Sequence, residues 1–215
     1  MGLSSQGDLV LAIAAAGVRD PRVLEAFREV PRAGYVPADW VGQADLDRPL
    51  PIPHGQVTTQ PSLVAAMLEA LGLTGAERAL EVGTGFGFQT ALLACLSGFV
   101  WSVERWADVA GAARANLARA GVKNVEVVVG DGSEGLPAHA PFDAILVAAA
   151  FPRVPPPLAE QLAAGGRLVQ PLGPGGDEEV VLFEKGPRGL IRRRTVVRAH
   201  FVRLYGTHGF PVDTR

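Results

Sequence analysis

A glycine-rich loop and two carboxylates have the residue types and spacing needed to hold a nucleotide-like ligand. The loop is residues 81–87 (Glu-Val-Gly-Thr-Gly-Phe-Gly), and it directly follows a short apolar run. Glu104 ends the next such run, nineteen residues after Gly85, where a carboxylate can accept hydrogen bonds from ribose hydroxyls. Asp131 ends a third run between two glycines, where its carboxylate can accept from an adenine amino group. Together these residues predict an adenosine-bearing cofactor.

The loop alone leaves other interpretations open. Its form, G-x-G-x-G, is compatible with a dinucleotide, a mononucleotide or no ligand. A redox dinucleotide is less favoured, because Phe88 stands where that fingerprint keeps its third glycine. Glu104 could otherwise be a surface carboxylate and Asp131 a turn residue. The joint spacing of the loop and both carboxylates favours the adenosine ligand.

The elements that must position these residues alternate between strands and helices after residue 60. Hydrophobic periodicity predicts strands at 78–82, 99–103, 125–129, 144–147 and 167–170, and helices at 61–73, 89–97, 107–120 and 158–164. Two later runs, 179–184 and 195–204, flank a turn signal at 185–189. The pattern predicts an α/β fold with a doubly wound, mostly parallel sheet and an antiparallel hairpin at its C-terminal edge.

The first sixty residues have a different texture. Two short helices are expected at 9–16 and 21–29, the second with Asp20 as N-cap and Pro21 in its first turn. Residues 31–60 contain five prolines, and an irregular connection of this length is uncommon unless it is functional. We therefore expect one domain, in which 1–60 form a helical and irregular cap or lid and 61–215 form the cofactor-binding core.

Composition argues against several classes of protein. The 215 residues include 20 basic and 22 acidic side chains, so the chain lacks the basic excess of a nucleic-acid binder. The arginines of 188–198 are typical of a solvated strand edge. We see no signal-peptide pattern, no apolar run of ~18 residues and no metal-ligand spacing. The sequence predicts a cytoplasmic protein without metal or membrane, with its single cysteine, Cys95, buried as a small hydrophobe.

Motifs outside the loop carry a family resemblance. The most specific are 47–52 (Asp-Arg-Pro-Leu-Pro-Ile) and 55–61 (Gly-Gln-Val-Thr-Thr-Gln-Pro), which methyltransferases at large do not share. Further matches lie at 30–32, 35–37, 103–105, 130–137, 141–145 and 165–169. On these residues the chain resembles the protein-L-isoaspartate O-methyltransferases over nearly its whole length. That family uses S-adenosyl-L-methionine to methylate the α-carboxyl of isoaspartyl residues in damaged proteins.

The resemblance implies a cofactor site and an acceptor site. The implied cofactor-binding residues are Gly83, Thr84, Gly85, Glu104, Arg105, Asp131 and Gly132. The implied substrate-binding residues are His54, Gly55, Gln56 and Gln60, with Thr59 as the catalytic residue at the position of the family's functional serine. The partners would be isoaspartyl proteins or peptides and not nucleic acid, and we expect a monomer.

The acceptor segment departs from the family pattern. The family usually reads G-Q-T-I-S-Q-P, so Val57 replaces a threonine and Thr59 replaces the serine, while Asp45 and Pro53 stand for a tyrosine and a glycine. Thr59 keeps a hydroxyl, but β-branching restricts its χ1. Two alternatives stay open: a related enzyme that methylates another carboxylate, and a catalytically silent cofactor-binding protein. A tRNA or DNA methyltransferase is the least favoured.

The chemistry itself needs no catalytic base. A carboxylate, with a pKa of about 4, is already ionised at pH 7, so an enzyme must desolvate and orient it for in-line displacement. A structural or backbone-positioning role is therefore favoured for His54. Gln56 and Gln60 are expected either to donate to the substrate or to anchor the lid, and Phe86 and Phe88 to pack against it.

Overall fold

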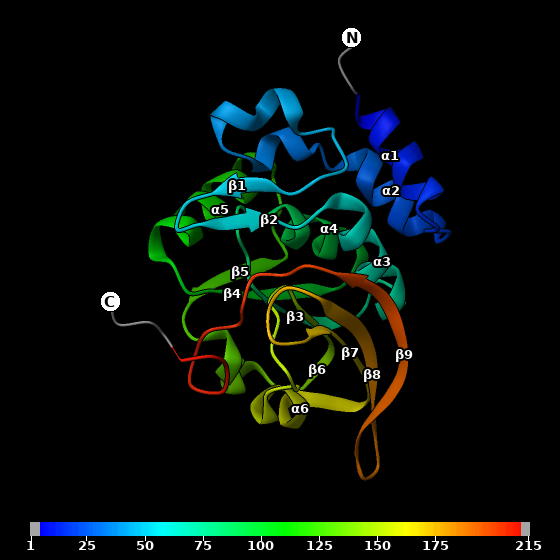
Figure 1. Cartoon of the computed structure of the whole chain (residues 1–215), viewed down its shortest axis with the longest axis vertical. Coiled ribbons are helices and arrows are strands. Elements are labelled where there is room, and N and C mark those ends of the chain that lie inside the picture. Colours follow the sequence, from blue (N-terminus) through cyan, green and yellow to red (C-terminus); the bar gives the residue numbers. More distant parts are fainter. Residues whose placement is uncertain (1–4, 212–215) are drawn as a thin grey trace.

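A seven-stranded sheet runs through the molecule in the order β5–β4–β3–β6–β7–β8–β9 (Figure 1). The computed structural model describes residues 5–211. The strands are β3 (Arg78–Val82), β4 (Phe99–Glu104), β5 (Val125–Val129), β6 (Phe142–Val147), β7 (Leu162–Leu172), β8 (Glu178–Gly186) and β9 (Gly189–Ala199). The first five of these pair in parallel, and β8 and β9 are antiparallel. The predicted doubly wound sheet with an antiparallel C-terminal hairpin is confirmed.

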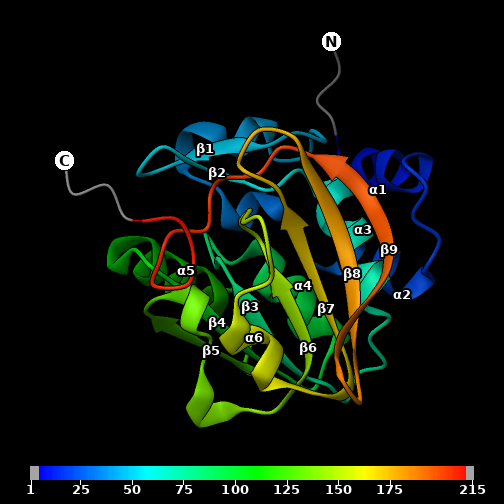
Figure 2. The same cartoon turned by 60° about the horizontal axis from the view of Figure 1, so that its bottom comes forward.

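Helices bury both faces of the parallel strands. The helices are α1 (Gln6–Ala15), α2 (Pro21–Glu29), α3 (Pro61–Leu71), α4 (Phe88–Leu96), α5 (Ala107–Arg119) and α6 (Pro156–Gln161). Successive strand residues point to opposite faces, so Ala79 joins the cluster under α1–α5 whereas Leu80 joins the one that contains Leu158 of α6. Figure 2 shows α6 on the near side of the sheet, with α4 behind it.

Residues 31–60, called the lid from here on, have more regular structure than predicted. Short 3₁₀ turns cover Arg32–Tyr35 and Ala38–Gln43, and an antiparallel hairpin joins β1 (Leu50–Ile52) to β2 (Gln56–Thr58). The hairpin lies over the carboxyl ends of the parallel strands (Figure 2). The lid therefore covers the edge of the sheet at which open α/β folds bind ligands.

The structure corrects the helix predicted at 158–164. Helix α6 ends at Gln161, and β7 begins at Leu162, which pairs with Phe142. Gly165 and Gly166 therefore lie within a strand and do not end a helix. The run 158–164 favours a helix locally, but its second part pairs with β6 in the sheet. Tertiary contacts routinely override local propensity in this way.

The last predicted strand, 195–204, was also misplaced. Strand β9 begins at Gly189, since Gly186 pairs with Gly189 across a turn shorter than expected. After Ala199 the chain leaves the sheet edge, and residues 202–204 instead exchange hydrogen bonds with Ala150. Figure 1 shows this segment crossing in front of the sheet below β2.

The exposure of Cys95 and the character of the helices bear on two further predictions. Cys95 is exposed on α4, so the prediction of a buried thiol was wrong: the apolar run around it contains one outward-facing helical position. Within residues 5–211, no helix combines the length and the apolar character needed to cross a bilayer.

Candidate active site

A cavity of about 960 Å³, including its open mouth, lies between the lid and the carboxyl ends of β3, β4 and β6. Its floor is the glycine loop, its roof is the segment from Gln56 to Thr59, and one wall is the segment from Val202 to Tyr205. Strand β3 is the point from which the chain winds outward in both directions, to β4 on one side and β6 on the other. Ligands bind at such switch points in open α/β sheets.

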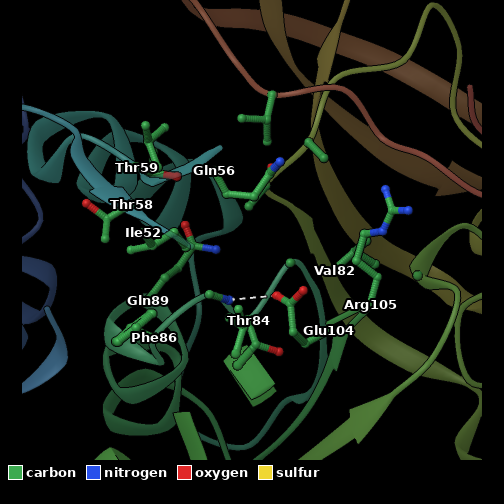
Figure 3. Close-up of a pocket in the computed structure, with 18 of the residues that line it drawn as sticks. Ile52, Gln56, Thr58, Thr59, Val82, Thr84, Phe86, Gln89, Glu104 and Arg105 are labelled. Carbon is green, nitrogen blue, oxygen red and sulfur yellow. Dashed lines mark hydrogen bonds between the residues drawn. The ribbon is translucent and has the colours of Figure 1, made fainter. Parts of the chain in front are cut away.

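The glycine loop and Glu104 are joined by hydrogen bonds. The loop glycines Gly83, Gly85 and Gly87 have φ values of 97°, 55° and 91°, which other residues rarely adopt. This conformation turns the Gly85 N–H toward Glu104, whose Oε2 accepts at 3.0 Å (Figure 3). The other oxygen, Oε1, accepts from the Trp106 N–H at 3.1 Å. Each oxygen keeps a second lone pair, so Glu104 is oriented and still able to accept from ribose hydroxyls.

Gly132 and its neighbour Asp131 have different surroundings. Gly132 lines the cavity, and a Cβ there would lie 2.5 Å from Cγ1 of Val82, so only glycine fits. Asp131 does not line the cavity. Its Oδ1 accepts from the amide and hydroxyl of Ser133, and its Oδ2 accepts from the Thr207 N–H at 2.6 Å. Burial opposes ionisation, but these hydrogen bonds outweigh it and lower the pKa of Asp131.

A buried carboxylate supports the loop from below. Glu81 is fully buried and accepts from Thr90 and Ser102 at 2.5 Å and from Gln89 Nε2 at 2.9 Å. The Ser102 hydroxyl donates to Glu81, so the Thr84 hydroxyl, 2.5 Å away, must donate to Ser102. Burial, with a smaller contribution from the negative charge of nearby Glu104, raises the pKa of Glu81 to about 7 against the opposing effect of its three hydrogen bonds.

Gln89 gives an independent indication of a polar ligand. Its side chain lines the cavity, yet its Oε1 is buried without a hydrogen-bond partner among the described residues. Buried acceptors are nearly always satisfied, so an unpartnered one at a cavity wall indicates a missing donor. With the carboxylates of Glu81 and Glu104 nearby, the site favours a cation that carries N–H donors and hydroxyls. S-adenosyl-L-methionine fits this donor set.

The lid brings two of its predicted residues to the cavity. Thr59 and Gln56 both line it, and Figure 3 places them on the lid side, across from Glu104 and the glycine loop. Gln56 also donates from Nε2 to the carbonyl oxygen of His54 at 3.0 Å. Gln60 is turned to the lid itself, since its Nε2 donates to Asp47 and Ser62 at 3.0 and 3.1 Å. That contact matches the lid-anchoring alternative for Gln60.

His54 lies at the tip of the β1–β2 hairpin and not at the cavity wall. Its ring stacks on Trp106 with 3.9 Å between centroids and 6° between planes. Its Nε2 lies 2.9 and 3.0 Å from the two carboxylate oxygens of Asp108, in the first turn of α5. This hydrogen bond from His54 is the main reason that the pKa of Asp108 is lowered. The tip of the lid is thus joined to the corner that follows Glu104.

The predicted site residues form two groups, those that line the cavity and those that do not. Those on its wall are Gln56, Thr59, Gly83, Thr84, Gly85, Glu104, Arg105 and Gly132, and those away from it are His54, Gly55, Gln60 and Asp131. The expected packing of Phe88 against the lid is confirmed by its ring contact to Tyr35 at 6.0 Å, and Phe88 also contacts Phe27 of α2 at 5.7 Å.

Sequence reasoning missed two parts of the wall. Ala148 and Ala149 follow β6, and the rule that ligands meet strand carboxyl ends could have indicated them. The wall from Val202 to Tyr205 had no such signal, because only the tertiary fold brings it to Ala150.

Comparisons with known proteins agree on one family. The profile described as protein-L-isoaspartate(D-aspartate) O-methyltransferase matches residues 4–209. A protein-L-isoaspartate O-methyltransferase from Methanoculleus marisnigri is 49% identical over 198 residues, covering 92% of this chain and 90% of the relative. One from Anaeromyxobacter dehalogenans is 52% identical over 190 residues, covering 87% and 91%. A solved protein-L-isoaspartate O-methyltransferase superposes with a TM-score of 0.83 at 28% identity, covering 95% of this chain and 67% of that one.

Proposed function

Because the chain belongs to the protein-L-isoaspartate(D-aspartate) O-methyltransferase family, we propose that it transfers a methyl group from S-adenosyl-L-methionine to the α-carboxyl of L-isoaspartyl residues in proteins and peptides. The observation that carries the proposal is a single cavity with Glu104 and the glycine loop on one side and the Thr59 segment of the lid on the other. A cofactor site and an acceptor site thereby share one cavity.

The cofactor side is assigned to residues of the loop and the strand ends. Glu104 accepts from ribose hydroxyls, and Gly83, Gly85 and Gly132 allow close approach of the main chain. Thr84, which is hydrogen-bonded to Ser102, and Gln89, which donates to Glu81, face the amino-acid end. Arg105 borders the mouth, where its guanidinium lies 4.8 Å from the Trp106 ring and 5.1 Å from that of Tyr205. Asp131 acts indirectly, by fixing the turn that presents Gly132.

Residues of the lid bind and orient the acceptor carboxylate. When bound, S-adenosyl-L-methionine supplies an electrophilic methyl group. Thr59 donates a hydrogen bond that orients the incoming carboxylate, and Gln56 donates a second from the roof. The hairpin excludes water from a nucleophile that is already ionised, which strengthens both contacts. No side chain is required to remove a proton.

Charge and edge structure bear on the partners and on the oligomeric state. A net charge of −2 supports protein or peptide partners over nucleic acid. The charged edge strand β9 supports a monomer, because exposed arginines oppose edge-to-edge pairing. A cytoplasmic location follows from the sequence pattern alone and stays a prediction.

An activity assay tests the proposal directly. The protein is incubated with an isoaspartyl peptide, its normal aspartyl counterpart and cofactor labelled in the methyl group. We expect a base-labile methyl ester on the isoaspartyl peptide only. Ester on another carboxylate would support the related-enzyme alternative, and cofactor binding without any ester would support a silent binding protein.

Variants of Thr59 locate the acceptor site. We expect Thr59→Ala to lower kcat about 10- to 100-fold, the loss of a charge-assisted hydrogen bond worth about 1.5–3 kcal/mol, with the affinity for S-adenosylhomocysteine unchanged. Thr59→Ser keeps the hydroxyl and should retain at least wild-type turnover. The control is Thr195→Ala on β9, remote from the cavity. Equal kcat in Thr59→Ala and wild type would remove the catalytic role of Thr59.

A further inference from the structure

A buried cation lies near the start of the lid. Arg32 is only 1% exposed, although arginine is almost never buried unless its charge and donors are compensated. Burial lowers the pKa of its guanidinium to about 10, and the negative charges of Asp47 and Asp45 counter that effect. Arg32 therefore stays charged at neutral pH and needs acceptors for its N–H groups.

All of those acceptors belong to the lid. The Nη1 and Nη2 groups donate to the carbonyl oxygens of Ala44 (3.1 Å), Leu46 (3.0 Å), Arg48 (2.9 Å) and Thr59 (3.5 Å) and to the hydroxyl of Thr58 (2.7 Å). The Nε group is buried and has no partner within residues 5–211. The two Nη groups of one side chain thus hold the stretch before the hairpin and the stretch after it.

Thr58 strengthens this connection. Its hydroxyl oxygen accepts both from Arg32 and, at 3.1 Å, from the Leu50 N–H of the facing strand. The side chain next to Thr59 is therefore fixed from two directions.

A second contact fixes the chain on the other side of Thr59. The carboxylate of Asp47 accepts from Gln60 Nε2 at 3.0 Å and from the Ser62 N–H at 2.8 Å. Thr59 thus lies between a segment held by a cation and a segment held by a carboxylate. Within residues 5–211, the Thr59 hydroxyl itself makes no hydrogen bond to protein, so its direction depends on these flanking contacts.

Arg32 also contacts the cofactor side of the cavity. Its guanidinium carbon lies 5.9 Å from the centroid of the Phe88 ring, at the first residue of α4 after the glycine loop. Phe88 lines the same cavity as Thr59. Arg32 therefore connects the acceptor segment to α4, the helix that begins directly after the glycine loop.

We propose that Arg32 and Asp47 are positioning residues for the acceptor site, which hold the main chain on either side of Thr59 so that its hydroxyl faces the cavity. Neither contacts the reacting groups. The inference rests on the proposed function for its kinetic consequence, but the placement of the lid can be measured without turnover.

The kinetic test compares Arg32→Lys and Asp47→Asn with Arg114→Lys. Lysine keeps the charge but loses the planar fork that reaches five acceptors, and asparagine keeps the shape but loses one acceptor oxygen. We expect each lid variant to lower kcat at least tenfold while still binding one S-adenosylhomocysteine per chain with Kd within twofold of wild type. Arg114 donates to a single carbonyl, that of Val127, and Arg114→Lys should keep full turnover.

Amide hydrogen exchange distinguishes a positioning role of Arg32 from a loss of folding in the variant. With S-adenosylhomocysteine bound, Arg32→Lys should raise amide exchange in residues 44–62 and leave 83–96 as in wild type. Thr58→Val, a milder change, should raise exchange in the same segment and reduce the further effect of Arg32→Lys, because the two residues share one contact.

Three results would overturn the proposal. The first is unchanged kcat in fully folded Arg32→Lys, and the second is unchanged exchange in residues 44–62. The third is a fall in kcat matched by an equal fall in bound cofactor per chain, which means global unfolding. If the wild type makes no ester, the proposed function fails, while the exchange result still decides whether Arg32 positions the lid.

Discussion

At the scale of single residues, Glu81 shows how a site can depend on a carboxylate that does not line it. The side chain is fully buried below the glycine loop and holds Gln89, Thr90 and Ser102 by hydrogen bonds. Three donors favour the ionised form, but burial disfavours it more, and the result is a pKa of about 7. A glutamate among the buried residues 79–82 of β3 is a sequence feature typical of such a network.

The raised pKa of Glu81 makes stability depend on pH. Between about pH 4.3 and 7 the unfolded chain has lost this proton while the folded chain keeps it, so the free energy of unfolding falls as pH rises. The cost above pH 7 is about 3.5 kcal/mol, at about 1.4 kcal/mol for each unit of the shift. We expect Glu81→Gln to flatten the decline, measured by urea unfolding at pH 5 and pH 7.5.

The difference between the wild type and Glu81→Gln at these two pH values assigns the decline to this carboxylate. Asp8, Glu77, Asp131 and Glu184 have lowered pKa values and so titrate below the chosen range. As a control, Glu126→Gln on the exposed side of β5 should keep the wild-type pH dependence. A decline of equal size in Glu81→Gln would show that another group is responsible.

At the scale of elements, the β1–β2 hairpin is held at both ends. Its base rests on Arg32, and its tip rests on the corner between β4 and α5 through His54, Trp106 and Asp108. His54 has a φ of 61°, a left-handed conformation that puts its ring in contact with the Trp106 ring. The tip therefore joins the lid to the turn that carries Glu104.

Loss of the tip contact should speed ligand release. A stacked aromatic pair contributes about 0.5–1.5 kcal/mol, so His54→Ala should raise the dissociation rate of S-adenosylhomocysteine about two- to tenfold. Stopped-flow tryptophan fluorescence would measure this rate, with kcat at saturating peptide as a second readout.

A matched histidine serves as the control for this contact. His139 lies 5.1 Å from the Trp101 ring but outside the cavity, so His139→Ala should leave the release rate unchanged. If His54→Ala releases S-adenosylhomocysteine at the wild-type rate, the hairpin tip does not control access. His54 would then return to consideration as a direct contact of the substrate.

At the scale of the whole molecule, β9 ends the sheet and carries the charges that we expect to oppose association. Its arginines are exposed, and Arg192 and Arg198 pair with Glu179 at 2.6 and 2.9 Å while Arg193 pairs with Glu184. Exposed pairs of this kind contribute little to stability. Their value lies in keeping a long edge strand from pairing with another chain.

Removing these charges should create self-association. We expect the triple variant Arg192→Thr, Arg194→Thr and Arg198→Thr to form dimers or larger species as concentration rises, while the wild type sediments as a monomer. A control with Arg28, Lys123 and Arg153 changed to threonine lowers the net charge by the same three units away from β9. Association of both variants alike would assign the effect to net charge and not to the strand edge.

The sequence by itself determined the cofactor half of this protein. A glycine loop after a strand, and a carboxylate at the end of the next strand, specify a ligand edge because parallel strands present their carboxyl ends together. The alternation of helices and strands likewise predicted the sheet. These signals are local or periodic, so they can be read without coordinates.

Only the tertiary structure decided the acceptor half. The motif 55–61 identified the lid, but the roles within it depend on contacts between distant segments: Arg32 with Thr58, Asp47 with Gln60, and His54 with Trp106. The start of β7 at Leu162 and the departure of the chain after Ala199 were decided in the same way, by pairing with Phe142 and Ala150. Such partners lie many residues apart, and no periodic pattern records which distant group will satisfy a buried charge or an unpaired strand.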